Sequence, residues 1–156
     1  MNINIRGRLF DLSKPKVMGI LNLTPDSFYD GGVHNEIDKI EDHVNKMVND
    51  GMDILDIGGY SSKPGAKNIS VDEELSRVIP ILKHIRKIFP ELVISIDTFR
   101  SKIASASLNE GADIINDISG GTLDKNMMSI VAKNNCPYIL MHMQGNPQNM
   151  PVSYTH

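Results

Sequence analysis

Four short apolar runs of this sequence end in, or carry near their end, a polar side chain: Asn22, Asp56, Asp97 and Asn116. If the runs are parallel strands, their carboxyl ends meet at one edge of a sheet, and alternate side chains share a face. The spacing therefore predicts that the four groups converge at matching depth. Each one alone is also compatible with a strand cap or a turn. As a set they favour a site, because buried polar groups need a ligand or a network to satisfy them.

The residue types suit recognition of a flat nitrogen-containing ring. A carboxylate such as Asp97 binds an amidine or amino group through charge-assisted hydrogen bonds. Asn116 carries a donor and an acceptor on one side chain, which suits the edge of a heterocycle. Asp56 has two open interpretations, since it can bind the same ring or orient a neighbouring side chain.

Two loops carry groups suited to a cation and to an anion. Residues 22–32 are rich in oxygen ligands, and the Asn22 carbonyl with waters and phosphate oxygens suits Mg²⁺. The alternative interpretation of this segment is a flexible turn. Residues 58–66 combine glycines, which leave backbone amides accessible, with Ser61, Ser62 and Lys63. This composition suits a diphosphate or another anion.

The elements that must position these residues follow from the apolar pattern. Strands are expected at residues 17–23, 52–57, 92–96, 113–118 and 138–143. Helical spacing of apolar residues lies between them, at residues 37–48, 71–85, 103–108 and 127–131. The helix at 71–85 follows Ser70-Val71-Asp72-Glu73, which has the form of a capping box. The alternation predicts an α/β fold, either an open doubly wound sheet or a closed barrel.

Two further features concern the ends of this pattern. Residues 3–10 are expected to form a small hairpin that turns at Gly7 and plugs the bottom of a barrel. A complete eight-stranded barrel needs about 250 residues, whereas this sequence has 156 and five strand-type runs after the hairpin. The chain is therefore expected to be part of a larger barrel.

Composition limits the possible partners and setting. The formal net charge is -3, and Lys and Arg are scattered, so nucleic-acid binding is not expected. No apolar run approaches the roughly 18 residues that span a bilayer, so no membrane partner is expected. The single Cys136 cannot form an internal disulfide and the amino terminus lacks a secretory signal, which favours the cytoplasm. Small molecules are the expected partners.

Two segments stand out as motifs: residues 21–32 are LNLTPDSFYDGG and residues 56–66 are DIGGYSSKPGA. They resemble the first and second signatures of one enzyme family, the dihydropteroate synthases. Segments similar to its later signatures follow in order at residues 95–98, 111–117 and 141–145. The resemblance implies a (β/α)₈ TIM-type barrel of the pterin-binding kind. Residues 1–156 would form its amino-terminal part, with about the first five βα units.

The resemblance also implies an activity. Members condense a dihydropterin diphosphate with p-aminobenzoate in folate biosynthesis, releasing pyrophosphate and forming dihydropteroate. Carried over by position, Asn22 would contact Mg²⁺ and the diphosphate, and Asn22, Asp97 and Lys63 would act in catalysis. The remaining implied contacts are Asp56, Asp97, Asn116, Ile118, Ile139 and Met141 for the pterin, and Phe28, Ser62 and Pro64 for p-aminobenzoate.

The chain departs from the family pattern in two ways. Tyr60-Ser61-Ser62-Lys63 stands where the family commonly has Glu-Ser-Thr-Arg. Ser62 keeps the hydroxyl group of that Thr, and Lys63 keeps the positive charge of that Arg without its planar guanidinium. Nothing in the sequence explains Tyr60. The family also takes an Asp, a Lys, an Arg and a His from a carboxyl-terminal half, and none of them lies in this sequence. The chain alone is therefore expected to be inactive, and the full-length protein is expected to be a homodimer.

Two rival hypotheses remain open at this point. One is a pterin-binding module of a folate-dependent methyltransferase, which would share the Asp and Asn pocket without handling diphosphate. The first signature loop argues against it. The other is a non-catalytic fragment that binds weakly or assembles with a missing half.

Overall fold

The computed structural model describes residues 1–23, 33–60 and 68–141. Its strands, in chain order, are β1 (Asn2–Ile5), β2 (Arg8–Asp11), β3 (Met18–Asn22), β4 (Ile54–Gly58), β5 (Val93–Asp97), β6 (Ile114–Asp117) and β7 (Tyr138–Leu140). The helices are α2 (Val33–Asn49), α3 (Val71–Ile88), α4 (Ser101–Asn109) and α5 (Met127–Asn134). All the expected elements are present, with boundaries shifted by a few residues.

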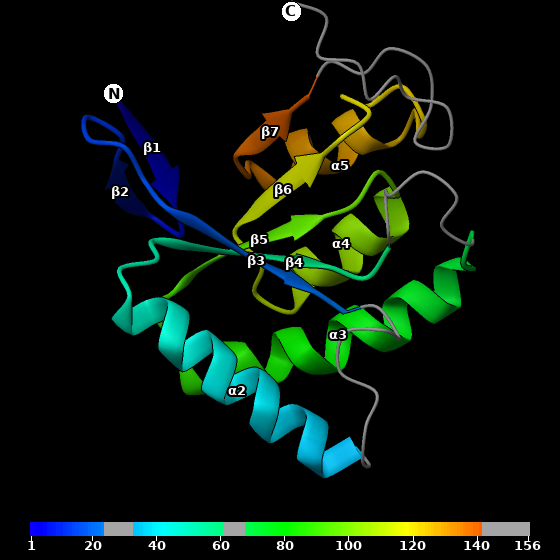
Figure 1. The fold of residues 1–156 in the computed structure, drawn as a ribbon. Coiled ribbons are helices and arrows are strands. Elements are labelled where there is room, and N and C mark those ends of the chain that lie inside the picture. The colour runs from blue at the N-terminus through cyan, green and yellow to red at the C-terminus, as the bar shows by residue number, and fades with distance from the viewer. Residues whose placement is uncertain (24–32, 61–67, 142–156) are drawn as a thin grey trace, which may run out of the picture.

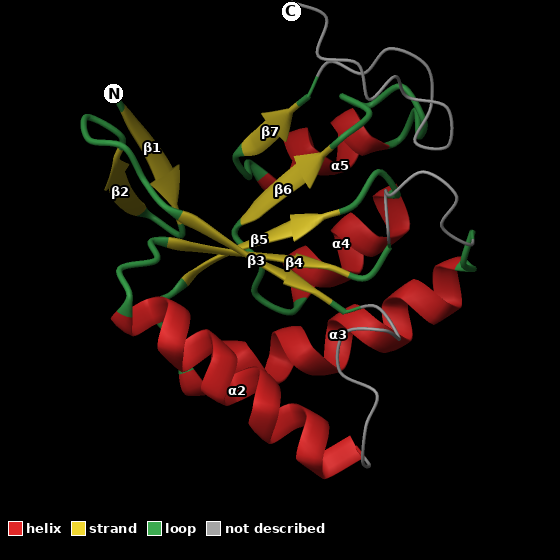
Figure 2. Ribbon diagram, in the orientation of Figure 1, coloured by secondary structure: helices red, strands yellow, loops and turns green. Residues whose placement is uncertain are grey.

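The order of the strands decides between the two α/β architectures. β3 to β7 form one parallel sheet in which spatial order equals chain order. A doubly wound sheet reverses its strand order at a switch point, and the described strands contain no such reversal. Helices α2 to α5 lie along one face of the sheet (Figures 1 and 2). The arrangement is a segment of a (β/α) barrel, with five of its parallel strands.

The main core lies between the sheet and its helices. Alternate strand residues point outward into it, and Leu55, Ile94 and Ile115 are among those that are fully buried. Val78, Leu82 and Ile85 of α3 meet them from the helical side, as their spacing predicts. These side chains leave the opposite, alternate set of strand residues to face the barrel interior.

The start of α3 follows the local sequence signal. Ser70 adopts an extended backbone, and its side chain accepts a hydrogen bond from the Glu73 backbone N–H at 3.1 Å. The expected reciprocal half of the capping box is replaced, because the Glu73 carboxylate pairs with Arg77 one turn later. The single cap still fixes where α3 begins, and therefore where the segment before it must end.

The amino-terminal hairpin closes the floor of the barrel segment. Arg6 and Gly7 have positive φ angles of 49° and 77°, the backbone of a tight two-residue turn. Ile5 is 4% exposed and packs with Ile54, Val93 and Ile114 at the amino-terminal ends of the strands. The predicted plug is confirmed, and it leaves the carboxyl ends of the strands as the accessible end of the barrel segment.

Candidate active site

Strand register places three of the predicted polar residues side by side. Asn22 pairs with Gly58, Gly58 with Asp97, and Asp97 with Asn116, so they form one row across β3 to β6. The row continues to Ile139 on β7. Because each pair is at the carboxyl end of its strands, the side chains face the end of the barrel where ligands bind in this architecture.

The prediction of equal depth is wrong for Asp56. Asp56 pairs with Ile20 and Ser95, which places it one step of side-chain alternation below the row. The last residue of β4 is Gly58, and it takes the place in the row where Asp56 was expected. Asp56 is 5% exposed and forms the floor of the site rather than its edge.

Asp97 is the least satisfied group of the site. Its carboxylate accepts no hydrogen bond from the described part of the chain, although it is mostly buried. Burial and then the nearby carboxylates of Asp56, Glu74 and Asp117 raise the pKa of Asp97 to about 7. A mostly buried acid among other acids, with no cationic partner among the described residues, costs stability and is a candidate acceptor for the donors of a ligand.

Asp56, below the row, is hydrogen-bonded to Asn116 in the row. Asn116 Nδ2 donates to Asp56 Oδ2 at 3.0 Å, which fixes the amide, and none of the described residues donates to its oxygen. Asp56 Oδ1 and Ser95 Oγ are buried without a hydrogen-bond partner among the described residues. Burial raises the pKa of Asp56, and the hydrogen bond from the Asn116 side chain opposes that rise. Asp56, Asp97 and Asn116 together present acceptors to a donor-rich ligand.

Three apolar residues flank this polar row at its β6 and β7 side. Ile118 follows β6 and is partly buried, while Ile139 and Met141 are each 38% exposed. The Met141 N–H donates to Asp117 O at 3.3 Å, which ties the end of β7 to β6. These side chains offer an apolar surface next to hydrogen-bonding groups, the usual composition of a site for a flat heterocycle.

Four implied site residues, Phe28, Ser62, Lys63 and Pro64, lie outside the described residues. Their predicted roles stay predictions.

The structure adds Glu74 and Arg100 to the neighbourhood of the site, and the sequence analysis missed both. Gly58 was predicted only as the start of the anion-binding loop, and the structure gives it a place in the row. Glu74 is 0% exposed, although it belongs to the first turn of α3, where acidic residues usually face water. Its spacing of four residues from Val78 in the apolar stripe was the signal available. The place of Gly58 in the row could have been found from the strand alternation alone.

The glycine at the centre of the row keeps the site open. A Cβ built at Gly58 would lie 3.5 Å from Asp97 Oδ2 and 3.6 Å from Asn22 Oδ1. These distances are ordinary contacts, so the fold tolerates a methyl group there, but the methyl would occupy the space between the two polar groups.

Gly58→Ala is therefore expected to weaken ligand binding without unfolding the protein. We expect the dissociation constant of a diphosphate-bearing ligand to rise about tenfold, as for an obstructed contact worth about 1.4 kcal/mol. The melting temperature should change by only a few degrees. Calorimetric titration and thermal melts measure the two effects, and unchanged binding in a folded variant would show that the row does not hold the ligand.

The residues at Asn22 fit a magnesium ion that arrives with a phosphate. Among the described residues, no three His, Cys, Asp or Glu side chains gather in the manner of a preformed metal centre. Mg²⁺ does not require one, because it keeps several waters and takes one or two protein oxygens plus phosphate oxygens. The exposed Asn22 amide oxygen, across Gly58 from Asp97, is a donor of that kind.

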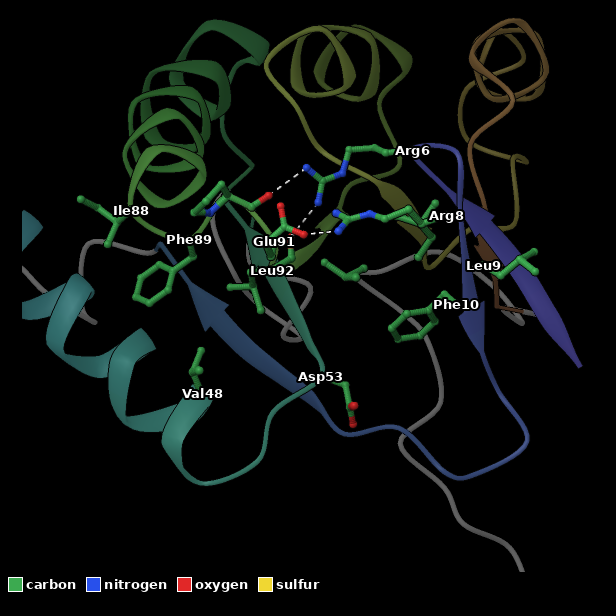
Figure 3. Close-up of a pocket in the computed structure, with 13 residues that line it drawn as sticks. Arg6, Arg8, Leu9, Phe10, Val48, Asp53, Ile88, Phe89, Glu91 and Leu92 are labelled. Atoms are coloured by element: carbon green, nitrogen blue, oxygen red, sulfur yellow. Dashed lines mark hydrogen bonds and ion pairs between the residues drawn. The ribbon is translucent and has the colours of Figure 1, made fainter.

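A pocket of about 600 Å³ lies at the opposite end of the strands, between the hairpin and the end of α3. Figure 3 shows Arg6, Arg8 and Glu91 in it, drawn toward one another. Arg6 donates to the backbone oxygens of Pro90 and Leu92, and Arg8 pairs with Glu91. Its charged groups are already satisfied, so this pocket does not compete with the strand-end site.

The fold and the site together define the class: a segment of an α/β barrel that gathers hydrogen-bond acceptors at the carboxyl ends of its parallel strands. The sequence model of the family described as pterin binding enzyme matches residues 18–155. The chain belongs to this family of pterin-binding enzymes.

Individual proteins similar to this chain include named dihydropteroate synthases. The chain is 47% identical over 150 residues to the dihydropteroate synthase of Escherichia coli K12, covering 96% of this chain and 52% of that protein. It is 50% identical over 149 residues to the mitochondrial folate synthesis bifunctional protein of Arabidopsis thaliana, covering 94% and 27%. The chain thus spans about half the length of the bacterial relative.

Solved structures of similar proteins agree with the fold. The Yersinia pestis dihydropteroate synthase with a sulfonamide drug complex matches with a TM-score of 0.84 and 42% identity, over 100% of this chain and 56% of that one. The Xanthomonas albilineans dihydropteroate synthase with 4-aminobenzoic acid matches with a TM-score of 0.83 and 39% identity, covering 93% and 53%. In the part of the chain that the structure describes, no helix is long and apolar enough to cross a membrane.

Proposed function

We propose that the complete protein carrying these residues condenses a dihydropterin diphosphate with p-aminobenzoate to give dihydropteroate and pyrophosphate. The observation that carries the proposal is the Asp97 carboxylate, which is mostly buried, unpartnered among the described residues and in register with Asn22 and Asn116. Relatives named dihydropteroate synthase at 47% to 48% identity support the same reaction.

The pterin is the ring that the strand-end acceptors suit. Its aminopyrimidine edge presents adjacent N–H donors, and a carboxylate accepts such a pair through charge-assisted hydrogen bonds. Asp97 supplies that carboxylate, while Asp56 Oδ1 below it and the Asn116 oxygen beside it accept no hydrogen bond from the described residues. Ile118, Ile139 and Met141 provide the apolar surface beside the ring.

The reaction breaks the bond between the pterin methylene carbon and the diphosphate oxygen. The pair of electrons leaves with pyrophosphate, the amino nitrogen of p-aminobenzoate forms the new bond to that carbon, and the amine loses a proton. Developing positive charge on the pterin is stabilised by ionised Asp97, a group whose field is already in place. Phe28, Ser62 and Pro64 are proposed to frame p-aminobenzoate, and Lys63 to meet the departing charge.

Magnesium is proposed as the cofactor, held at Asn22. When bound, Mg²⁺ neutralises charge on the leaving diphosphate and orients it. The support is chemical: Asn22 offers a hard oxygen ligand at the strand end, next to the space that Gly58 leaves open.

The activity is proposed for a protein longer than residues 1–156. The two outermost strands of the parallel sheet carry exposed apolar residues, Ile20 at 63% and Leu140 at 58%. Further strands would cover both, and would supply the cationic residues that the family resemblance implies. We further propose a homodimer for the complete protein and a cytoplasmic setting. The cytoplasmic setting is supported by the single Cys136.

The test is product formation by the purified complete gene product. Both substrates and Mg²⁺ are supplied, and dihydropteroate and pyrophosphate are followed by mass spectrometry and a coupled assay. The proposal expects equal amounts of the two products and no product without p-aminobenzoate or after chelation of the metal. Tight pterin binding without pyrophosphate release would instead favour a pterin-binding module that does no diphosphate chemistry.

A further inference from the structure

The position of the Asp97 carboxylate is set by the backbone of β5. None of the described residues donates a hydrogen bond to this carboxylate. The Asp97 backbone is in register with Gly58 on β4 and with Asn116 on β6. Because β5 ends at Asp97, the contacts of the next residue, Thr98, determine how firmly the carboxylate is held.

Thr98 is fixed by three hydrogen bonds to different parts of the fold. Its N–H donates to the Asn116 backbone oxygen at 3.0 Å, which joins the end of β5 to the end of β6. Its Oγ1 donates to Glu74 Oε1 at 2.8 Å and accepts from the Arg100 N–H at 3.2 Å. Thr98 is 2% exposed, so water competes little for these contacts. The hydroxyl group thus ties the end of β5 to the first turn of α3.

Glu74 is itself held in one position. It is 0% exposed, and its other oxygen, Oε2, accepts from Arg100 Nη1 at 2.7 Å. A buried carboxylate is costly to leave without donors, so Glu74 keeps both hydrogen bonds. Gly59, directly after β4, packs so closely on this side chain that an added Cβ would lie 3.2 Å from Glu74 Cγ. Glu74 therefore provides a fixed point between the ends of β4 and β5.

We infer that Thr98 is a positioning residue, whose hydroxyl group holds the end of β5 against Glu74 and so places the Asp97 carboxylate for the pterin. The inference rests on the proposed function, because it takes the pterin as the ligand of Asp97. Hydrogen bonds from a pterin edge to a carboxylate are directional, so a small displacement of Asp97 weakens them together.

Matched substitutions separate the hydroxyl group from the rest of the Thr98 side chain. Thr98→Val has nearly the same shape without the hydroxyl, and Thr98→Ser keeps the hydroxyl. In calorimetric titrations of the complete gene product, we expect Thr98→Val to raise the dissociation constant of the dihydropterin diphosphate about tenfold, the effect of one hydrogen bond to a charged group. Thr98→Ser should bind as wild type does. If Thr98→Val does not fold, Thr98→Ala replaces it, because the smaller side chain leaves room for a water that donates to Glu74.

A double-mutant cycle with Asp97→Asn distinguishes positioning from a general loss of stability. If Thr98 acts through the Asp97 carboxylate, Thr98→Val should change the dissociation constant by no more than about twofold in the Asp97→Asn background. A similar tenfold loss in both backgrounds, or unchanged binding by folded Thr98→Val, would overturn the inference.

Amide hydrogen exchange tests the anchoring without any ligand. The residue-98 N–H, which donates to Asn116 O, should lose about tenfold of its protection in Thr98→Val and keep it in Thr98→Ser. Equal protection in wild type and both variants would show that the hydroxyl group does not anchor the end of β5. If the wild type binds the dihydropterin diphosphate but forms no dihydropteroate, the proposed function fails, while the binding cycle and the exchange still decide the role of Thr98.

Discussion

Asp97→Asn is expected to lower kcat/KM by about a thousandfold, the effect of losing a charged partner in a buried hydrogen-bonded contact worth about 4 kcal/mol. The substitution keeps the size of the side chain but presents an amide in place of a carboxylate. The NH₂ group of that amide is a hydrogen-bond donor, and it would face the N–H donors of the pterin edge. Steady-state kinetics on the complete gene product measure the loss. Activity within a few-fold of wild type would remove Asp97 from the site.

The same substitution is expected to make the folded protein more stable at neutral and alkaline pH. The pKa of Asp97 is raised from an ordinary 3.8 to about 7, so the folded state holds its proton more tightly than the unfolded state. Wild-type stability is therefore lost as the pH rises between these two values. The linkage amounts to about 1.4 kcal/mol for each pKa unit, and Asn has no such dependence.

Denaturant unfolding at several pH values checks the sign of this effect. The difference in the free energy of unfolding between Asp97→Asn and wild type should be small near pH 4 and reach a plateau above pH 7. Asp53→Asn is the matched control with the opposite sign. The Val17 N–H, at 2.9 Å, and Lys16 lower the pKa of Asp53. Replacing the Asp53 carboxylate should therefore lower the stability of the folded protein at pH values above the ordinary pKa of an aspartate. Parallel stability curves for Asp97→Asn and wild type would contradict the account.

Arg86→Leu is expected to destabilise the fold by about 3 kcal/mol, the lower end of the cost of breaking a buried ion pair, because Arg6 still pairs with the same Asp113 carboxylate. Arg86 Nη2 lies 2.7 Å from Asp113 Oδ2, and the Asp113 side chain is fully buried. The same guanidinium donates to Gly111 O at 2.8 Å and to Leu92 O at 2.7 Å. Arg6 Nε meets the other Asp113 oxygen at 2.6 Å, so the hairpin is tied to the same carboxylate.

The control for this prediction is an ion pair of the same helix at the surface. Lys83 Nζ lies 3.1 Å from Glu110 Oε1, with the Lys83 side chain 55% exposed, so Lys83→Ala should change stability by at most about 1 kcal/mol. Urea unfolding of the two variants gives the comparison. Equal effects would mean that the Arg86 network contributes no more than a surface pair. The activity of folded Arg86→Leu should be unchanged, because the network lies at the floor of the barrel segment.

The sequence predicted the elements of this fold because their signals are local. Ser70 marks the start of α3, and the turn at Gly7 marks the hairpin, each within a few residues. The alternation of apolar and polar residues also placed Asn22, Asp97 and Asn116 on one face. The order of the strands could be determined only from the structure, because an open sheet and a barrel have the same periodicity of apolar residues.

What the sequence missed depends on contacts between distant segments. The depth of Asp56 follows from the register between β4 and β5, which pairs it with Ser95. Glu74 is buried because Thr98 and Arg100 arrive from another strand end to satisfy it. The spacing of Glu74 from Val78 hints at its burial, but no local pattern identifies the partners that satisfy Glu74 or the depth of Asp56, since both depend on which residues meet across the fold.

A calorimetric titration with a pterin at pH 7, in buffers of different ionisation enthalpy, tests the central claim most directly. Asp97, with a pKa of about 7, is then about half protonated, and a ligand that donates to the carboxylate must displace that proton. The account predicts release of about half a proton per pterin bound by the wild type, and weaker binding without release by Asp97→Asn. Equal affinities with no proton release in either protein would show that Asp97 does not bind the pterin.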